Sequence, residues 1–301
     1  RTQYHNQYCE FEEPSCCQVA NLKQFSPVYS RLQSYPIKVR LNFARAVDMS
    51  KNLETLIALL REAQQLVFFT GAGLSTESGI PDFRSPGTGL WNKIKPIEFS
   101  DFVNSEDARA ESWRRKFTGD RAMTTAEPNS GHLAIAELID INRCNGVITQ
   151  NVDNLHQQAG VNETHIVELH GNATYAACLS CGQRYELAEL ESQYQQNQHI
   201  HPCPLCGGLI KTATISFGQA MPEEAMQRAA ELTSQCDLMI VLGSSLTVYP
   251  AAAFPEHVAQ RGDKLVIINQ QPTGLDSLAD LVINESIGSV LPSAVAALAP
   301  N

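Results

Sequence analysis

The chain has 301 residues, of which 43% are hydrophobic, and a formal net charge of −10. This length and apolar content can bury one large core with a smaller inserted module. The acidic balance argues against a nucleic-acid backbone as the main partner. No apolar run approaches the roughly 18 residues that a membrane-spanning helix needs, so the sequence predicts a soluble protein without a membrane partner.

Residues 1–48 differ in composition from the rest of the chain. They show no sustained hydrophobic period, and residues 14–47 contain basic but no acidic side chains. This composition weakly resembles a transit peptide, although three glutamates stand among residues 10–13, where such a peptide would begin. We expect a poorly structured N-terminal extension over residues 1–48. The folded domain is expected over residues 49–301, because apolar side chains repeat at helical spacing directly after residue 49.

Four cysteines form two Cys-x2-Cys knuckles separated by 21 residues. They are Cys178, Cys181, Cys203 and Cys206. Four thiolates at this spacing can close tetrahedrally around Zn2+. Because every ligand position is a cysteine, no position is left for a catalytic water, and the predicted ion is structural. A thioredoxin-like redox pair is the alternative, which the duplicated knuckle disfavours.

The other five cysteines show no sign of a disulfide framework. Cys144 and Cys236 border apolar runs, where a free cysteine is usually a small buried hydrophobic residue. The sequence therefore predicts a reducing compartment. We expect the cytoplasm, with the mitochondrial matrix as the alternative.

Apolar runs that end in glycine or polar residues predict a parallel sheet with a ligand site at one edge. Residues 66–70 lead into Gly71-Ala72-Gly73-Leu74-Ser75, a turn that lets the backbone approach a pyrophosphate. Three further runs, at 146–149, 238–242 and 265–268, lead into Gln150-Asn151-Val152-Asp153, Gly243-Ser244-Ser245 and Asn269. Ligands bind outside the carboxyl ends of the strands in a doubly wound sheet. We therefore expect an α/β, Rossmann-like large domain, although Thr76 in place of the third glycine disfavours an ordinary dehydrogenase.

Two further segments carry residues typical of a catalytic site. Gly79-Ile80-Pro81-Asp82-Phe83-Arg84 opens a Ser/Gly/Pro-rich stretch that ends at Gly89, which is typical of a mobile loop over a cofactor. Glu77 and Ser78, directly before it, are interpreted as local helix-start residues. His170 lies directly before the predicted zinc module, and clefts commonly form where two domains meet. A histidine titrates near neutrality and can act as a general base; a hydrogen-bonded structural histidine is the alternative.

These motifs occur together, in the same order, in the sirtuin (Sir2) family, which the chain resembles over roughly residues 54–298. The segments that carry the resemblance are residues 71–84, Thr149-Gln150-Asn151-Val152-Asp153, Leu169-His170-Gly171, the cysteine quartet and Gly243-Ser244-Ser245-Leu246. The class II branch, of mitochondrial and bacterial type, is most similar at Pro96-Ile97, Asp101-Phe102-Val103, Pro128-Asn129 and His132. The resemblance implies a catalytic domain over residues 49–301, with a zinc-ribbon module inserted at about residues 171–218.

The resemblance implies an NAD-dependent protein-lysine deacylase of the deacetylase type. Its cofactors would be NAD and one structural zinc ion, and its partners acyl-lysine segments of proteins. In this family the acyl-lysine amide oxygen attacks C1′ of the nicotinamide ribose and nicotinamide leaves. His170 would then deprotonate the ribose 2′-hydroxyl, directly or by relay, so that the acyl group passes to ADP-ribose. The alternatives are a protein ADP-ribosyltransferase or NAD hydrolase in the same pocket, which needs this base less, and a non-catalytic NAD-binding module.

The resemblance also assigns roles to single residues. The catalytic positions are matched by His170, Asn151 and Asp153. Val152 and Asp153 match the pocket for the nicotinamide carboxamide, Phe83 matches the aromatic residue that shields C1′, and Arg84 is the arginine of the same loop. The other matching cofactor-binding positions are Gly71, Ala72, Gly73, Ser75, Asp82, Gln150, Gly243, Ser244, Ser245 and Asn269.

Two departures from the family pattern concern the substrate. Family members commonly carry Pro-x-Val-Val-x-Phe-Gly-Glu after the second knuckle, where this chain has Thr212-Ala213-Thr214-Ile215-Ser216-Phe217-Gly218-Gln219. Main-chain pairing with an extended peptide tolerates such changes, but the lost acidic residue is expected to alter peptide preference. Branches that remove succinyl or malonyl groups use Tyr-x-x-Arg, and Ser112-Trp113-Arg114-Arg115 retains only the arginine. Removal of acidic acyl groups is therefore not favoured, although an arginine alone can pair with a carboxylate.

Overall fold

The computed structural model describes residues 37–83, 87, 89, 95–118 and 122–298, and within residues 37–47 it describes the backbone alone. The chain divides into two compact units, with the boundary after Ser50. Helix α2 (Ile37–Glu62) begins before the predicted domain start at residue 49. Residues 37–48 contain neither glycine nor proline, the residues with the lowest helix propensity, so the helix can extend upstream. The rest of the predicted extension lies outside the described residues.

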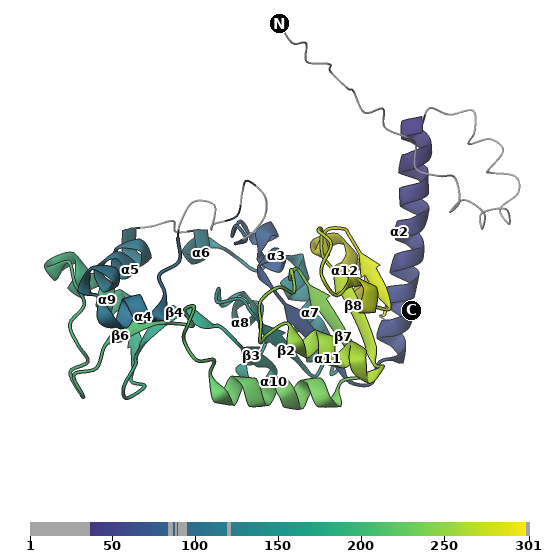
Figure 1. Cartoon of the computed structure of the whole chain (residues 1–301). Coiled ribbons are helices and arrows are strands. Elements are labelled where there is room, and N and C mark those ends of the chain that lie inside the picture. The colour runs from purple at the N-terminus through teal and green to yellow at the C-terminus, as the bar shows by residue number, and fades with distance from the viewer. Residues whose placement is uncertain (1–36, 84–86, 88, 90–94, 119–121, 299–301) are drawn as a thin grey trace, which may run out of the picture. The chain divides into compact units, whose positions relative to one another are not determined.

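The larger unit is built around a parallel sheet of six strands in the order β3-β2-β1-β7-β8-β9 (Figure 1). Its strands are β1 (Leu66–Thr70), β2 (Gly146–Thr149), β3 (Ile166–Glu168), β7 (Leu238–Leu242), β8 (Lys264–Ile268) and β9 (Leu281–Ile283). Strands β1, β2 and β7 are buried along their whole length, as expected for parallel strands covered on both faces. The strand order reverses at β1, which confirms the predicted doubly wound α/β fold.

Helices cover both faces of this sheet because side chains alternate along each strand. On one face, alternate residues of β1 and β7 pack with α2, α7 (Ser130–Asp140) and α12 (Ile287–Ala296). On the other face, the intervening residues pack with α10 (Glu223–Gln235) and α11 (Ala253–Arg261). The sheet is thus packed between helices on both faces.

Further helices connect these elements. They are α3 (Ala72–Ser75), η1 (Thr76–Ser78), α4 (Phe99–Asn104), α5 (Glu106–Thr118), α6 (Ala122–Thr125), α8 (Leu155–Gln158), η3 (Glu163–His165) and η4 (Asp276–Leu278). None of the described helices combines the length and apolar character needed to cross a membrane.

A second, antiparallel sheet carries the cysteine quartet, in the order β5-β4-β6. Its elements are β4 (Gly171–Cys178), β5 (Arg184–Glu186), helix α9 (Leu187–Asn197) and β6 (Ile210–Thr214). Its core joins Cys178 and Cys203 to residues of α9, and it also contains Trp113 of α5. The module core thus includes α5 as well, which lies outside the insertion at about residues 171–218 that the sequence predicted.

Candidate functional site

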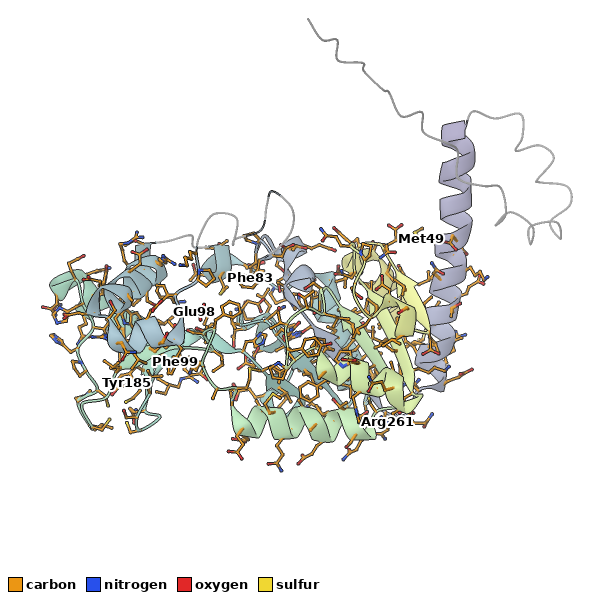
Figure 2. All side chains as sticks on the ribbon, in the orientation of Figure 1. Met49, Phe83, Glu98, Phe99, Tyr185 and Arg261 are labelled. Carbon is orange, nitrogen blue, oxygen red and sulfur yellow. The ribbon has the colours of Figure 1, made fainter. Side chains whose placement is uncertain are left out.

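A cleft of about 860 Å³ lies at the carboxyl ends of the parallel strands. Residues that follow β1, β2, β3, β7 and β8 line it together with residues of α4, α5 and β6. The predicted site residues in its lining are Ala72, Gly73, Asp82, Phe83, Gln150, Asn151, His170, Gly243, Ser244, Ser245 and Asn269. Figure 2 labels Phe83, which contributes an aromatic wall. Arg84 lies outside the described residues, as does most of the predicted loop beyond it.

The glycine turn after β1 packs directly against the end of β7. The backbone N–H of Gly73 donates to the oxygen of Gly243 at 2.8 Å, and a Cβ on Gly73 would come within 2.7 Å of the Gly243 Cα. Gly243 has a φ of +65°, and its own Cβ would overlap the backbone nitrogen of Leu74. Only glycine allows this close approach. The two strand ends therefore meet at the point where the strand order reverses, which is where doubly wound sheets bind ligands.

Asn151 is fixed from behind by the glycine turn. Its Nδ2 donates to the oxygen of Gly71 and to Ser75 Oγ, both at 3.1 Å. Ser75 Oγ in turn donates to Asp153 Oδ2 at 2.7 Å, and the other oxygen of Asp153 accepts the N–H of Leu155. Ser75 and Asp153 are buried, and neither they nor Gly71 belong to the lining of the cleft. In this structure these three predicted site residues hold Asn151 in place and do not face the cleft.

His170 lines the cleft with one ring nitrogen bonded to the backbone. Its Nδ1 lies 2.9 Å from the oxygen of Gln150, and because a carbonyl oxygen only accepts, Nδ1 carries the proton. In the neutral ring Nε2 therefore holds the lone pair, which is the state that a general base needs. Gly171 has a φ of +71°, and a Cβ there would overlap the oxygen of Ala213. The residue after His170 must be glycine for β4 to pair with β6.

Sequence reasoning missed two contacts that connect the residues after the glycine turn to distant helices. Glu77 lines the cleft and accepts hydrogen bonds from Ser286 Oγ at 2.9 Å and from the N–H of Gly288 at 3.2 Å, where α12 begins. Asn129 caps α7 and donates from Nδ2 to Ser78 Oγ at 3.0 Å. Glu77 and Ser78 thus connect segments far apart in the chain, in addition to starting a local helix. No pattern within a short window signals such pairs.

Two buried histidines lie behind the strand ends, with ring centroids 5.2 Å apart. Burial lowers the pKa of His132 to about 4 and that of His156 to about 3, so both rings are neutral. The Nδ1 of His132 accepts the N–H of Asn129. The Nε2 of His156 donates to Thr70 Oγ1 at 3.0 Å, because that hydroxyl already donates to Thr149. The two neutral rings thus lie behind the ends of β1 and β2 and hydrogen-bond to Asn129 and Thr70.

Three cations from the inserted module also line the cleft. They are Arg115, Lys116 and Lys211. Lys116 Nζ donates to the oxygen of Ala173 at 2.6 Å, and Lys211 Nζ donates to the oxygen of Thr214 at 2.5 Å. Burial lowers the pKa of both lysines, that of Lys211 to about 8. Backbone oxygens, which carry no full charge, are the hydrogen-bond acceptors of both ammonium groups.

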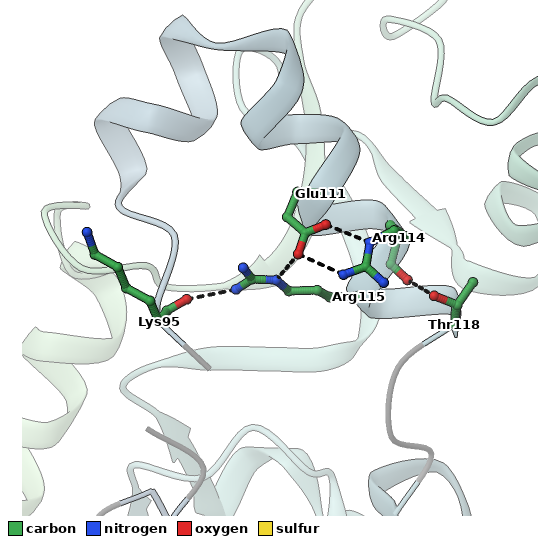
Figure 3. A network of polar contacts seen from close by, with 5 residues as sticks. All are labelled: Lys95, Glu111, Arg114, Arg115 and Thr118. Carbon is green, nitrogen blue, oxygen red and sulfur yellow. Dashed lines mark hydrogen bonds and ion pairs between the residues drawn. The ribbon is translucent and has the colours of Figure 1, made fainter. Parts of the chain in front are cut away.

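Arg115 is the arginine of the segment that partly matches Tyr-x-x-Arg. Its guanidinium donates to Glu111 Oε1 at 2.6 Å and to the oxygen of Lys95 at 2.8 Å (Figure 3). Arg114 donates to the same carboxylate, at 2.6 Å and 2.8 Å. Hydrogen bonds from Arg114 and Arg115 lower the pKa of Glu111 to about 2. Arg115 therefore reaches the cleft with its charge already paired.

The Sγ atoms of the cysteine quartet lie within 4.8 Å of one another. The separation is 3.5 Å between Cys178 and Cys206 and 3.7 Å between Cys181 and Cys203, close to the roughly 3.8 Å edge of a tetrahedron with Zn–S bonds of about 2.3 Å. The quartet therefore fits a structural zinc ion. Tyr185, labelled in Figure 2, donates its hydroxyl to Cys203 Sγ at 3.0 Å and lowers the pKa of that thiol to about 6. This favours the thiolate that binds the metal, and no sequence pattern pointed to it.

Comparison with known proteins decides the family. Residues 71–250 match the profile of the Sir2 family. The chain belongs to the Sir2 family. It is 50% identical over 246 residues to an NAD-dependent protein deacetylase of Rhodopseudomonas palustris, and the aligned region covers 82% of this chain and 97% of the relative. It is 51% identical over 246 residues to NAD-dependent protein deacetylase 1 of Bradyrhizobium diazoefficiens, and the aligned region covers 82% of this chain and 96% of the relative.

Solved Sir2 structures share the fold of this Sir2 protein. A Sir2 complex with a p53 peptide and NAD+ has a TM-score of 0.72 at 34% identity, and the match covers 81% of this chain and 98% of that one. A Sir2 protein bound to a propionylated peptide has a TM-score of 0.70 at 34% identity, with the same coverage of 81% and 98%. The α/β architecture with an inserted cysteine module is therefore the Sir2 architecture.

Proposed function

We propose that this Sir2 protein is an NAD-dependent protein-lysine deacylase, which transfers an acyl group from lysine to ADP-ribose and releases nicotinamide. The observation that carries the proposal is the juxtaposition of His170, its Nδ1 proton held by Gln150, with Asn151 in the lining of one cleft. A positioned base next to a fixed side-chain amide suits acyl transfer. The relatives that are 50% and 51% identical are NAD-dependent protein deacetylases.

The chemistry of the cleft lining suits NAD. When bound, NAD supplies the ribose that accepts the acyl group and the nicotinamide that leaves. Gly73, Ser244 and Asn269 line the cleft directly after β1, β7 and β8, at the carboxyl ends of the strands where doubly wound sheets bind dinucleotides. Asn151, backed by Ser75, orients the reacting end. Phe83 covers that end and limits access of water.

In this proposal His170 is the proton acceptor of the site. Its Nε2 takes up the hydroxyl proton that acyl transfer releases. The oxygen of Gln150 remains bonded to the Nδ1 proton at 2.9 Å and stabilises the ring when it becomes positively charged. Asp153 and Ser75 contribute through the position of Asn151, because both are buried behind it.

We further propose that an acyl-lysine segment of a protein lies extended along the chain after β6. Residues 215–218 line the cleft, and the N–H of Phe99 holds the oxygen of Phe217 at 2.8 Å; Phe99 is labelled in Figure 2. Strand β6 is at the edge of its sheet, where backbone groups can pair with a peptide strand. Small uncharged acyl groups are favoured, because Arg115 is already paired with Glu111.

A reducing compartment suits the free thiols. Cys144 and Cys236 are buried without a disulfide, and the relatives reported above are bacterial proteins. We place the protein in the cytoplasm, with the mitochondrial matrix as the alternative.

The experiment that tests the function follows two products at once. Replacing His170 with Ala is expected to lower deacylation of an acyl-lysine peptide about 10²- to 10⁴-fold, the usual contribution of a general base. NAD binding and nicotinamide exchange in the presence of the peptide are expected to persist, because neither needs this proton acceptor. Mass spectrometry of peptide and nucleotide products checks both.

His165→Ala is the matched control, since this histidine is not in the lining of the cleft. A His170→Ala protein that deacylates at the wild-type rate would contradict the proposal. The ADP-ribosyltransferase or NAD-hydrolase alternative would then account better for the pocket. ADP-ribosylated peptide or free ADP-ribose as the main product would identify which of the two it is.

A further inference from the structure

Two histidines outside the catalytic cleft face each other on the segment between α9 and the second cysteine knuckle. His199 and His201 are both exposed. The Nε2 of His199 lies 3.1 Å from the Nδ1 of His201, and the two rings are edge to face with centroids 4.4 Å apart. The proposed deacylase mechanism uses neither residue, and neither belongs to the cysteine quartet.

The tautomer of His199 is set by the backbone. Its Nδ1 lies 3.0 Å from the oxygen of Asn197, and because a carbonyl only accepts, Nδ1 carries the proton. The Nε2 of His199 therefore directs a lone pair at His201. Metal-binding histidines are held in this way, with the other ring N–H donated to a carbonyl or a carboxylate.

The spacing of the two nitrogens fits a chelated metal. Metal–nitrogen bonds of about 2.0–2.1 Å place two cis nitrogens about 2.9 Å apart at a right angle and about 3.4 Å apart at a tetrahedral angle. The observed 3.1 Å lies between these values. On metal binding, the proton shared between the rings leaves Nδ1 of His201 for its own Nε2 or for solvent. The two rings then turn so that both lone pairs face the ion.

The segment is held in shape without a metal. Gln198 has a φ of +58° and ends α9 by donating its N–H to the oxygen of Tyr194 at 2.7 Å. The N–H of His201 donates to Gln193 Oε1 at 3.0 Å. Both ends of the histidine pair are thus anchored to α9, so little conformational entropy is lost when an ion binds.

We propose that His199 and His201 form a second, exposed site for a divalent transition metal, with water in the remaining coordination positions. Imidazole nitrogens suit Ni2+, Cu2+ and Zn2+ and not Mg2+ or Ca2+. The site is open, unlike the closed quartet, so its metal exchanges with solvent. An ion here links the end of α9 to the segment that leads into Cys203.

The test uses the full chain with its quartet loaded with zinc, and Ni2+ as the probe. Calorimetry is expected to show one Ni2+ bound per chain, and His199→Ala or His201→Ala is expected to lower the affinity at least about tenfold, as losing even an outer-shell partner does. His257→Ala, an exposed histidine on α11, is the matched control and is expected to change nothing. Unchanged Ni2+ binding in the His199→Ala, His201→Ala double variant would overturn the proposal.

A second measurement identifies the nitrogen atoms that bind the metal. It uses the wild-type protein, so a variant that fails to fold cannot affect it. Adding a second equivalent of Zn2+ to the wild-type protein is expected to shift the imidazole ¹⁵N resonances of His199 Nε2 and His201 Nδ1. The Nδ1 of His199 is expected to keep its proton. Coordination through Nδ1 of His199, or no shift at either ring, would contradict the assigned geometry.

Discussion

The orientation of the His170 ring depends on residues at the ends of three strands. The backbone oxygen of Gln150 accepts the hydrogen bond from His170 Nδ1. The backbone N–H of Gln150 donates to the oxygen of Thr70, at the end of β1, at 2.9 Å. The side-chain oxygen of Gln150 accepts the hydroxyl of Ser244, after β7, at 2.6 Å. The orientation of the proposed base is therefore fixed by the parallel sheet, and a site built on strands is positioned more accurately than one built on loops.

A second residue-scale effect concerns Lys211 and pH. Burial lowers its pKa from the ordinary 10.5 to about 8, so between about pH 8 and 10.5 the unfolded chain binds a proton that the folded chain does not. Stability is therefore expected to rise with pH across that window, by up to about 1.4 kcal/mol per pH unit from this group. Below pH 8 both states are protonated and the slope from Lys211 vanishes.

The Lys211→Met variant is expected to lack this contribution. Denaturant unfolding at pH 7.5, 8.5 and 9.5 would measure it as the difference in slope from the wild type. Lys51→Met, an exposed lysine, is the control for the loss of one positive charge. Parallel stability curves for the wild type and Lys211→Met would show that Lys211 titrates as it does in the unfolded chain.

A third residue-scale expectation concerns the preference for the acyl group. Glu111 holds Arg115 at 2.6 Å, so the wild type is expected to favour an acetyl over a succinyl peptide. Glu111→Ala leaves Arg115 available to a substrate carboxylate, and the ratio of kcat/KM for acetyl over succinyl is expected to fall about tenfold, or about 1.4 kcal/mol. Glu106→Ala, on the exposed side of the same helix, is the control. An unchanged ratio would mean that Arg115 does not meet the acyl group.

At the scale of elements, the predictable features were local patterns. The runs at 66–70, 146–149 and 238–242 form β1, β2 and β7 with the predicted bounds, because strands buried on both faces are continuous apolar runs. The cysteine spacing likewise predicted the quartet that the structure brings together. Trp113 of α5 joins the core of the module, and Glu77 contacts α12 across 209 residues. Such contacts leave no period in a short window. The class II assignment stays a prediction.

The pairing of β4 with β6 gives an element-scale prediction. Gly171→Ala places a Cβ against the oxygen of Ala213 at a φ of +71°, so β6 must shift away from His170. The free energy of unfolding is expected to fall by more than the roughly 1–2 kcal/mol that a left-handed alanine costs, and kcat is expected to fall with it. Gly262→Ala is the control, because Gly262 has a φ of +88° with no atom within 4 Å of its Cβ. Equal losses in the two variants would show that only backbone strain matters.

At the scale of the larger unit, the described residues form apolar clusters of unequal size. Two clusters enclose the parallel sheet, and the third is the smaller core of the inserted module, which contains Cys178 and Cys203 themselves. A core this small rarely stabilises a fold without a metal or a disulfide. Because α5 belongs to this core and also brings Arg115 and Lys116 to the cleft, we expect the zinc site to stabilise one wall of the proposed catalytic cleft.

Zinc removal is therefore expected to abolish activity through the module and to spare the sheet. Cys203→Ser removes one of the four ligands and should release the zinc ion from the quartet. The module should then unfold, because zinc binding at such sites supplies about 10–16 kcal/mol of folding free energy. Calorimetric unfolding is expected to lose the contribution of the module while the transition of the parallel sheet remains. Tyr185→Phe, which keeps all four ligands and removes only the hydroxyl bonded to Cys203, is expected to weaken zinc about 10- to 100-fold without unfolding the module. Zinc content, unfolding and deacylation measured on the same samples would check this order. A zinc-free Cys203→Ser protein with wild-type activity would contradict it.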